Sequence, residues 1–354
     1  KKVFNQKKVL ITGHTGFKGS WLSIWLKMLG ANVTGISSDI PTNPSHYKET
    51  FIEKKINNVE LNIQDLDKLK KIIIKEKPDF IFHLAAQSLV RKSYNNPLET
   101  WKTNLIGTIN ILECLRDLEN CVAVIITSDK CYDNKEWIYG YKETDTLGGS
   151  DPYSASKGSA EIAIKSYINS FYTNKEIRVA SARAGNVIGG GDWAEDRIIP
   201  DCVRSWSQGN PVELRNPNST RPWQHVLEPL SGYLRLASIL NQDKNLSGET
   251  FNFGPSGLEV FTVEDLVSKM SESWKKVRWN SNKSDNNQLY ESGLLKLNCD
   301  KALSILKWKA TLNFEETVRF TSEWYSNFYN KDKPILEMTE SQIREYLSIA
   351  ELRK

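Results

Sequence analysis

The chain has 354 residues, enough for one large domain with an appendage or for two domains. Its 47 basic and 43 acidic residues are spread along the whole length, and the net charge of +4 indicates no nucleic-acid partner. No apolar run approaches the ~20 residues of a membrane span, and the N-terminus has no signal-peptide pattern, so we expect a cytoplasmic protein without a membrane partner. The five cysteines are scattered, without a Cys-x-x-Cys pair or a nearby histidine cluster, which argues against disulfides and against a metal site.

Short apolar runs alternate with helical patterns along the first half of the chain. Strands are predicted at 8–12, 32–36, 59–63, 79–84, 123–128 and 178–183, and helical spacing occurs between them, as around 103–118. Parallel neighbouring strands need crossover connections. This order therefore predicts a doubly wound, parallel α/β sheet of the Rossmann type.

The pattern loosens from residue 189 onward into glycines, prolines and polar turns, which predicts a smaller region that covers a substrate. A helical pattern at 230–240 and a strand-like run at 249–254 are expected to return to the sheet. We therefore assign residues 1–185, with 229–255, to a dinucleotide-binding domain. Residues 186–228 and 256–354 form a smaller, partly discontinuous C-terminal substrate domain in this prediction.

A glycine-rich turn, TGHTGFKG at residues 12–19, follows the first strand and opens a helix. Glycines in this context let the backbone approach a pyrophosphate, and the helix N-terminus offers free N–H groups. The ribose ligand of NAD normally follows the second strand, where Ser37 and Asp39 are both candidates. No arginine lies nearby to bind a 2′-phosphate, so NAD is preferred over NADP.

Tyr153 and Lys157 lie four residues apart in DPYSASK, at 151–157, and thus share one face of a predicted helix. An ammonium beside a phenol favours the phenolate. The pair can therefore supply a base, which an isolated tyrosine with a pKa of about 10 cannot do near neutral pH.

A hydroxyl, a carboxyl and an amine cluster in TSDK, at 127–130, where the fifth strand ends. Open α/β sheets bind ligands at this edge. Ser128 can hydrogen-bond a substrate alkoxide, and Asp129 and Lys130 can act as acid and base if the site shifts their pKa values. The alternative is a solvated turn that carries a charged pair.

These motifs occur in the order typical of extended short-chain dehydrogenases/reductases, together with HLAA at 83–86 and Asn104 with Gly107. The resemblance spans nearly the whole chain. Longer strings at 14–22, 127–133, 183–193 and 221–230 resemble the nucleotide-sugar 4,6-dehydratases, and in particular the branch that acts on CDP-glucose. The CDP-glucose substrate and a role in deoxysugar biosynthesis are implied by the resemblance alone.

The resemblance implies internal redox by NAD. Tyr153 takes the proton of the C4 hydroxyl while Ser128 hydrogen-bonds the same oxygen. Elimination across C5 and C6 follows, with Asp129 as the acid. The related dTDP-glucose dehydratases have Asp-Glu where this chain has Asp129-Lys130. Lys130 is either the C5 base, which requires a depressed pKa, or an electrostatic stabiliser of the enolate while another group moves the proton.

The resemblance also implies two sets of binding residues. The expected cofactor ligands are Gly13, Thr15, Gly16, Phe17, Lys18, Gly19, Asp39, Asn62, Ile63, Leu84, Ala85, Ala86, Asn104, Tyr153 and Lys157. The expected substrate ligands are Ser88, Asn186, Arg215 and Arg221, the arginines because a guanidinium suits phosphate oxygens.

Two other functions fit part of the pattern. A nucleotide-sugar 4-epimerase needs Tyr153 and Lys157 but has no need of Asp129 and Lys130 as an elimination pair. A non-catalytic dinucleotide-binding protein keeps the fold but can lose the Tyr/Lys pair, which is intact here. A homodimer or homotetramer is expected through the helices around Thr103 and Tyr153.

Overall fold

A seven-stranded parallel sheet forms the centre of the computed structural model, which describes residues 2–173, 175–214, 216–255, 261–274, 277–281 and 294–353. The strand order is β11-β6-β5-β4-β1-β2-β3, and every neighbouring pair is parallel. The strands are β1 (Lys8–Thr12), β2 (Asn32–Ser37), β3 (Asn57–Glu60), β4 (Phe80–His83), β5 (Asn120–Ile126), β6 (Glu176–Ala184) and β11 (Thr250–Phe253). The predicted doubly wound sheet is confirmed, with β3 earlier in the chain than expected.

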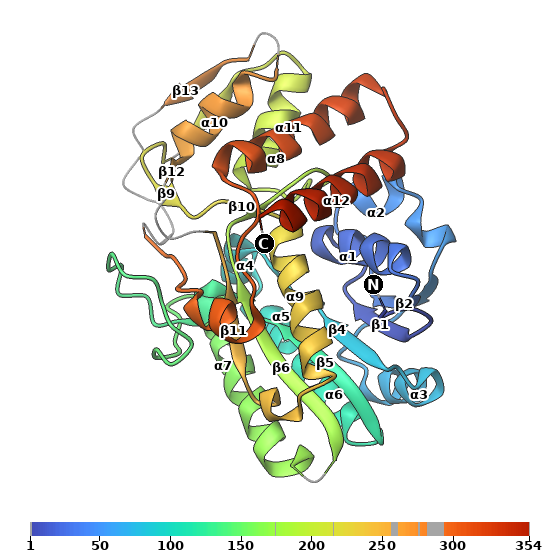
Figure 1. Cartoon of the computed structure of the whole chain (residues 1–354). Coiled ribbons are helices and arrows are strands. Elements are labelled where there is room, and N and C mark those ends of the chain that lie inside the picture. The colour runs from blue at the N-terminus through green and yellow to red at the C-terminus, as the bar shows by residue number, and fades with distance from the viewer. Residues whose placement is uncertain are drawn as a thin grey trace.

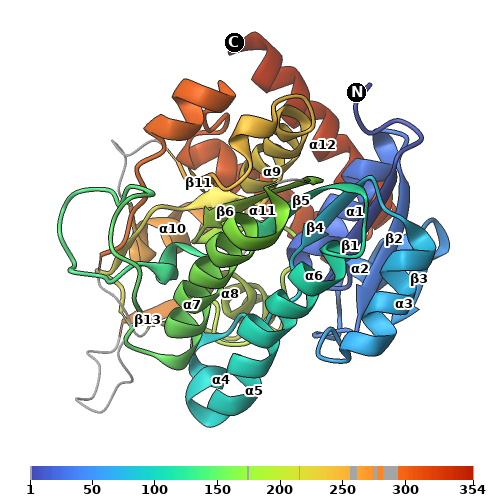
Figure 2. The ribbon, with the colours of Figure 1, turned by 90° about the horizontal axis from the view of Figure 1, so that it is seen from below.

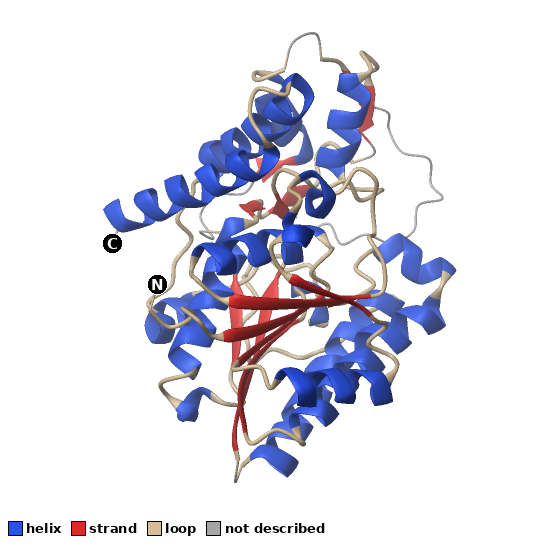
Figure 3. Cartoon of the chain, turned by 90° about the vertical axis from the view of Figure 1, so that its right-hand side faces the viewer, coloured by secondary structure: helices blue, strands red, loops and turns tan. Residues whose placement is uncertain are grey.

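Helices cover both faces of the sheet (Figures 1 and 3). Figure 2 shows α3 (Leu66–Glu76), α6 (Gly107–Leu115) and α7 (Pro152–Tyr167) on one face. On the other face lie α1 (Phe17–Met28), α9 (Leu227–Leu240) and α12 (Ile335–Leu352). The side-chain alternation of β1 explains the two cores, because Val9 and Ile11 pack in one cluster and Leu10 packs in the other.

The remaining helices are α2 (His46–Glu49), α4 (Val90–Asn95), α5 (Pro97–Trp101), α8 (Ile198–Ser207), α10 (Val263–Ser271) and α11 (Phe314–Asn330). Three two-stranded sheets join β7 (Val187–Ile188) to β10 (Gln224–His225), β9 (Thr220–Arg221) to β12 (Phe261–Thr262), and β8 (Val212–Leu214) to β13 (Trp279–Ser281). In Figure 1 these small sheets lie with α8, α10 and α11 above the main sheet. They form the region that covers its upper edge.

The C-terminal helix α12 packs back onto α1, the helix that follows the glycine turn. The Trp25 and Tyr346 rings lie 5.7 Å apart, centroid to centroid. His46 bridges the same two helices, through Ser20 at 2.7 Å and Thr339 at 3.1 Å. Residues 335–352 therefore help to fix the glycine turn, although they are far from it in sequence.

Among the described residues, no helix has the length and apolar character that a membrane crossing requires.

Candidate active site

The glycine turn is packed too closely to accept side chains. Gly13 has a φ of +74°, and a Cβ atom built on it would lie 2.7 Å from the backbone nitrogen of Ala85. A Cβ on Gly19 would lie 2.1 Å from the carbonyl oxygen of Gly13. The turn thus brings bare backbone to the start of α1, where a helix N-terminus favours anionic groups.

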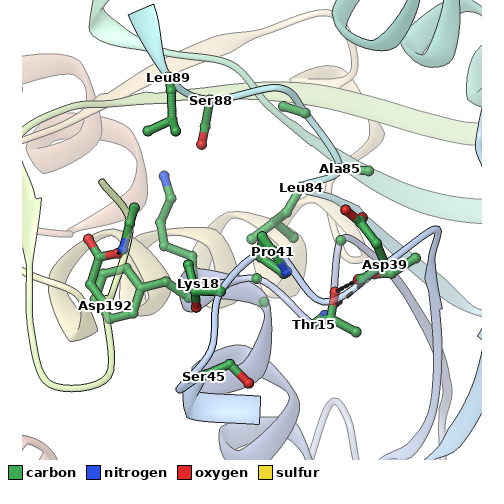
Figure 4. A pocket seen from close by; sticks show the side chains of 18 of the residues that line it. Thr15, Lys18, Asp39, Pro41, Ser45, Leu84, Ala85, Ser88, Leu89 and Asp192 are labelled. Carbon is green, nitrogen blue, oxygen red and sulfur yellow. Dashed lines mark hydrogen bonds between the residues drawn. The ribbon is translucent and has the colours of Figure 1, made fainter. Parts of the chain in front are cut away.

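A cavity of about 930 Å³ opens over this turn and over the carboxyl ends of β2, β4 and β5. Figure 4 shows Thr15 and Asp39 at one end of it, and Lys18, Ser88 and Asp192 at the other. Of the predicted cofactor ligands, the following line this cavity: Gly13, Thr15, Gly16, Phe17, Lys18, Gly19, Asp39, Asn62, Ile63, Leu84, Ala85, Ala86, Tyr153 and Lys157. A cavity of this volume, with the glycine turn in its wall, suits a dinucleotide.

Asn104 differs from the prediction, because it does not line the cavity. Its side chain is buried, and the side-chain oxygen accepts a hydrogen bond from the backbone nitrogen of Gln87 at 2.8 Å. The Asn104 side-chain nitrogen donates to the backbone carbonyl of Gln87 at 3.0 Å and to the Ser156 hydroxyl at 2.9 Å. Asn104 therefore holds the segment after β4 against α7.

Ser37 and Asp39 both line the cavity at the end of β2. The Ser37 hydroxyl is engaged within the protein, by the Thr15 nitrogen at 3.4 Å and by the His14 ring at 3.1 Å. The Thr15 hydroxyl donates to the Asp39 carbonyl at 2.7 Å, which fixes the backbone that carries the exposed Asp39 carboxylate (Figure 4). This arrangement favours Asp39 as the group that meets a ligand.

A second cavity, of about 380 Å³, adjoins the first. It is lined by the predicted residues Ser88, Ser128, Asp129, Lys130, Tyr153, Asn186 and Arg221. Ser88, Thr127 and Tyr153 belong to the walls of both cavities. Tyr153 therefore lies at their junction, while Lys157 lines only the larger one. The remaining predicted ligand, Arg215, lies outside the described residues.

Asp129 is held at the end of β5 by its neighbours and is only 4% exposed. The Ser128 hydroxyl donates to one carboxylate oxygen at 2.9 Å, and the Asn186 amide lies 3.3 Å from the other. The backbone N–H of Lys130 donates to the Ser128 hydroxyl at 3.2 Å. A hydroxyl, a carboxylate and a half-buried amine thus face one cavity from a single helical turn.

The surroundings of Tyr153 act on its ionisation in both directions. Burial raises the pKa of Tyr153 to about 12, while the Ser128 hydrogen bond and the Arg197 charge work to lower it. Burial, followed by Lys18, lowers the pKa of Lys157 to about 8. The Lys157 ammonium donates to the Ile126 carbonyl at 3.3 Å. The helical spacing places both side chains at the site, where Ser128 and Arg197 also act on the phenol.

Arg197 and Asp192 were not predicted from the sequence. Both line both cavities, and the Arg197 guanidinium donates to the nearly buried Asp192 carboxylate at 2.7 Å. The cavities also share Lys18, whose pKa is lowered to about 8 by burial and then by Arg197. The loop between β7 and α8 carries the pair. No helical or strand periodicity could have revealed it, because loop residues follow neither period.

Among the described residues, no cluster of three or more His, Cys, Asp or Glu side chains could hold a metal ion.

Comparison with known proteins agrees with this architecture. Residues 10–321 match the family model described as GDP-mannose 4,6 dehydratase. The chain is 44% identical over 355 residues to the CDP-glucose 4,6-dehydratase of Salmonella typhimurium, with 98% of each chain covered. It shares its fold with the UDP-glucuronic acid 4-epimerase of Bacillus cereus in complex with UDP-glucuronic acid and NAD, at a TM-score of 0.77 and 22% identity over 91% of this chain and all of that one. The dTDP-glucose 4,6-dehydratase of Bacillus anthracis in complex with NAD gives a TM-score of 0.75 at 21% identity, over 93% and 99% of the two chains. The family predicted from the motifs is confirmed, and the chain belongs to the nucleotide-sugar dehydratase family that the GDP-mannose 4,6 dehydratase model describes.

Proposed function

We propose that the chain is an NAD-dependent CDP-glucose 4,6-dehydratase, which converts CDP-glucose into CDP-4-keto-6-deoxyglucose and water. The observation that carries the proposal is the junction of the two cavities at Tyr153, with Asp129 and Lys130 lining only the smaller one. A hydride site and an elimination pair thus adjoin. The 44% identity to a CDP-glucose 4,6-dehydratase supports the choice of substrate.

The residues have separate roles in this reaction. NAD, held by the residues that line the larger cavity, would supply the acceptor for the C4 hydride and its donor at C6. Tyr153 removes the proton of the C4 hydroxyl, and Ser128 donates a hydrogen bond to the same oxygen. Once C4 is a ketone, the C5 hydrogen becomes acidic. A base then removes the C5 proton while Asp129 protonates the C6 hydroxyl, which leaves as water, and a proton returns to C5 when C6 receives the hydride.

The larger cavity fits NAD on the chain's own residues. The glycine turn leaves room only for backbone at Gly13 and Gly19, which suits a pyrophosphate above the start of α1. We assign the ribose hydroxyls to Asp39 rather than Ser37, because the Ser37 hydroxyl is engaged by Thr15 and His14. Arg197, together with Asn186 and Arg221, is assigned to the substrate side of the junction.

Lys130 is the residue that decides between dehydration and other fates of the ketone. It is either the C5 base or an electrostatic stabiliser of the enolate. In both roles, Lys130→Ala leaves oxidation at C4 intact, seen as reduced dinucleotide, and blocks loss of water. Lys135→Ala is the matched control. Lys135 lies five residues after Lys130 in the segment between β5 and α7, lines neither cavity, and forms an ion pair with Asp133 at 2.6 Å. Normal dehydration by Lys130→Ala would refute the role.

The direct test incubates the purified protein with CDP-glucose. The expected product is a 4-keto sugar, which absorbs in alkali, with loss of the C6 hydroxyl seen by NMR. UDP-, dTDP- and GDP-glucose in parallel reactions test the choice of base. A 4-epimer that retains water would establish the epimerase instead, and no turnover on any nucleotide sugar would leave a dinucleotide-binding protein.

A homodimer or homotetramer is proposed as the assembly. Large apolar side chains are exposed on α5, α7 and the helical turns that follow α5 and α7, namely Leu98, Ile106, Ile162 and Phe171. Exposed apolar side chains on neighbouring helices are typical of interaction sites. Sedimentation velocity of the purified chain measures the assembly. The cytoplasmic location stays a prediction of the sequence.

A further inference from the structure

A buried carboxylate continues the face of α7 that carries the hydride-transfer pair. Glu161 follows Tyr153 and Lys157 at the same four-residue spacing, so the three side chains lie along one side of the helix. Glu161 is 4% exposed and lines neither of the two cavities. The reaction described above therefore does not use it directly.

The Glu161 carboxylate joins α7 to the strand end that carries the elimination pair. Thr127, which directly precedes Ser128, donates its hydroxyl hydrogen to one carboxylate oxygen. One residue earlier along β5, the Ile126 carbonyl accepts the hydrogen bond from Lys157. The helix is thus tied to two successive residues at the end of β5, immediately before the catalytic turn.

The same carboxylate forms a buried ion pair with β6. The Arg183 guanidinium donates to both oxygens, at 3.0 and 3.1 Å, and the Ser181 hydroxyl donates at 2.8 Å. Both members of the pair have side chains that are 3% exposed. Arg183 also lies over the Tyr132 ring, 4.7 Å from its centroid. The ion pair therefore fixes α7, β5, β6 and the residue after the catalytic turn in one arrangement.

The charge of Glu161 acts on Lys157. Burial works to raise the pKa of Glu161, but the charge of Arg183 and the hydrogen bonds leave that pKa below its ordinary value. Burial and Lys18 lower the pKa of Lys157, and Glu161 opposes them. Among the other titratable groups near Lys157, burial lowers the pKa of His83 to about 3 and raises that of the Cys131 thiol.

We propose that Glu161 is a positioning residue for hydride transfer, which sets α7 against the end of β5 and keeps Lys157 protonated. The inference rests on the proposed function. A buried ion pair can also serve the fold alone, and the experiment must separate these roles.

Two charge-removing variants separate them. Glu161→Gln and Arg183→Gln each break the same buried ion pair, so a purely structural role predicts the same kind of change for both. An electrostatic role predicts opposite changes. Glu161→Gln removes the negative charge beside Lys157, and the alkaline limb of the hydride-transfer rate moves down by about one pH unit. In Arg183→Gln the buried Glu161 loses the partner that lowers its pKa, but it should still be ionised at the alkaline pH of the limb, where its unpaired negative charge moves the limb up.

The rate is measured in single turnovers with CDP-glucose, from the absorbance of the reduced nicotinamide as the pH is varied. Ser181→Ala is the matched control, because it removes one hydrogen bond to the carboxylate without changing a charge. Its limb should coincide with that of the unaltered protein. Glu161→Asp keeps the charge on a shorter side chain, so its limb stays in place while its rate falls.

Limbs that move in the same direction in the two glutamine variants, or that do not move, would overturn the proposal. If either glutamine variant fails to fold, Glu161→Asp tests the proposal. This variant keeps the negative charge, so an alkaline limb that moves when its hydride-transfer rate falls would contradict the proposed effect of that charge on Lys157. If the unaltered protein reduces no NAD with any nucleotide sugar, the proposed function fails. The pH dependence of NAD affinity in the same variants then tests Glu161 on its own.

Discussion

Replacement of Gly185 by alanine should separate the two halves of the reaction. Gly185 lies against Asp129, the proposed catalytic acid, and a Cβ atom built on Gly185 would lie 1.9 Å from an Asp129 carboxylate oxygen. Ordinary contact begins near 3.4 Å, so the carboxylate must retreat by about 1.5 Å. The 3.3 Å contact with the Asn186 amide and the 2.9 Å hydrogen bond from Ser128 would not survive this displacement.

The displacement sets the expected magnitude. A misplacement of about 1 Å in a reacting group costs roughly 100-fold in rate, and removal of a general acid costs about 100-fold or more. We therefore expect elimination to slow by at least about 100-fold. Tyr153 lies on α7, whereas Gly185 lies in the segment that follows β6, so oxidation at C4 should proceed. The added methyl group should cost about 1 to 3 kcal/mol of stability.

The assay follows both steps in one reaction. Reduced nicotinamide should accumulate in Gly185→Ala with CDP-glucose, while the 4-keto-6-deoxy product forms slowly. Gly254→Ala is the matched control, because its Cβ would meet no atom closer than the Cys299 sulfur at 3.5 Å. Product formation by Gly185→Ala at the unaltered rate, in a folded protein, would refute the assignment of Asp129 as the acid.

Three further predictions concern the cofactor site, the stability and the assembly. Gly13→Ala should weaken NAD binding by at least about tenfold in a fluorescence titration, since its Cβ would collide with Ala85 and its φ of +74° is strained for alanine; unchanged affinity would contradict the backbone cradle. Burial raises the pKa of Glu228 to about 7, so this group contributes stability below its unfolded pKa near 4.5 and loses it as the pH rises through 7, by up to about 3 kcal/mol. The melting temperature of Glu228→Gln should accordingly vary less between pH 5 and 8 than that of the unaltered protein, and equal slopes would exclude Glu228 as the cause. Ile162→Glu introduces a charge at an exposed position of α7 and should shift the sedimentation coefficient to that of a monomer. An unchanged coefficient would show that this face is not the interface.

Much of the fold could be predicted because its determinants are local. The period of two in β1 separates Val9 and Ile11 from Leu10, and the core divides in the same way. The start of α7 is equally local: Asp151 caps the helix by accepting from the Ser154 nitrogen at 3.0 Å, and Pro152 occupies the first turn. The glycine turn and the Tyr153–Lys157 spacing lie in such segments, so the sequence alone places them correctly.

Long-range contacts decided the rest. The sequence predicts Asn104 as a cofactor ligand, yet its side-chain amide donates hydrogen bonds to Gln87 and Ser156. A buried amide needs such hydrogen-bond partners within the protein. The Arg197–Asp192 pair on its loop and the Glu161–Arg183 pair within the core follow no spacing rule. The sequence by itself determined the sheet, the dinucleotide turn and the identity of the acid–base candidates, since each depends on neighbours along the chain. Only the tertiary structure decided that two cavities meet at Tyr153 and which charges surround that phenol, because those features arise where distant segments pack together.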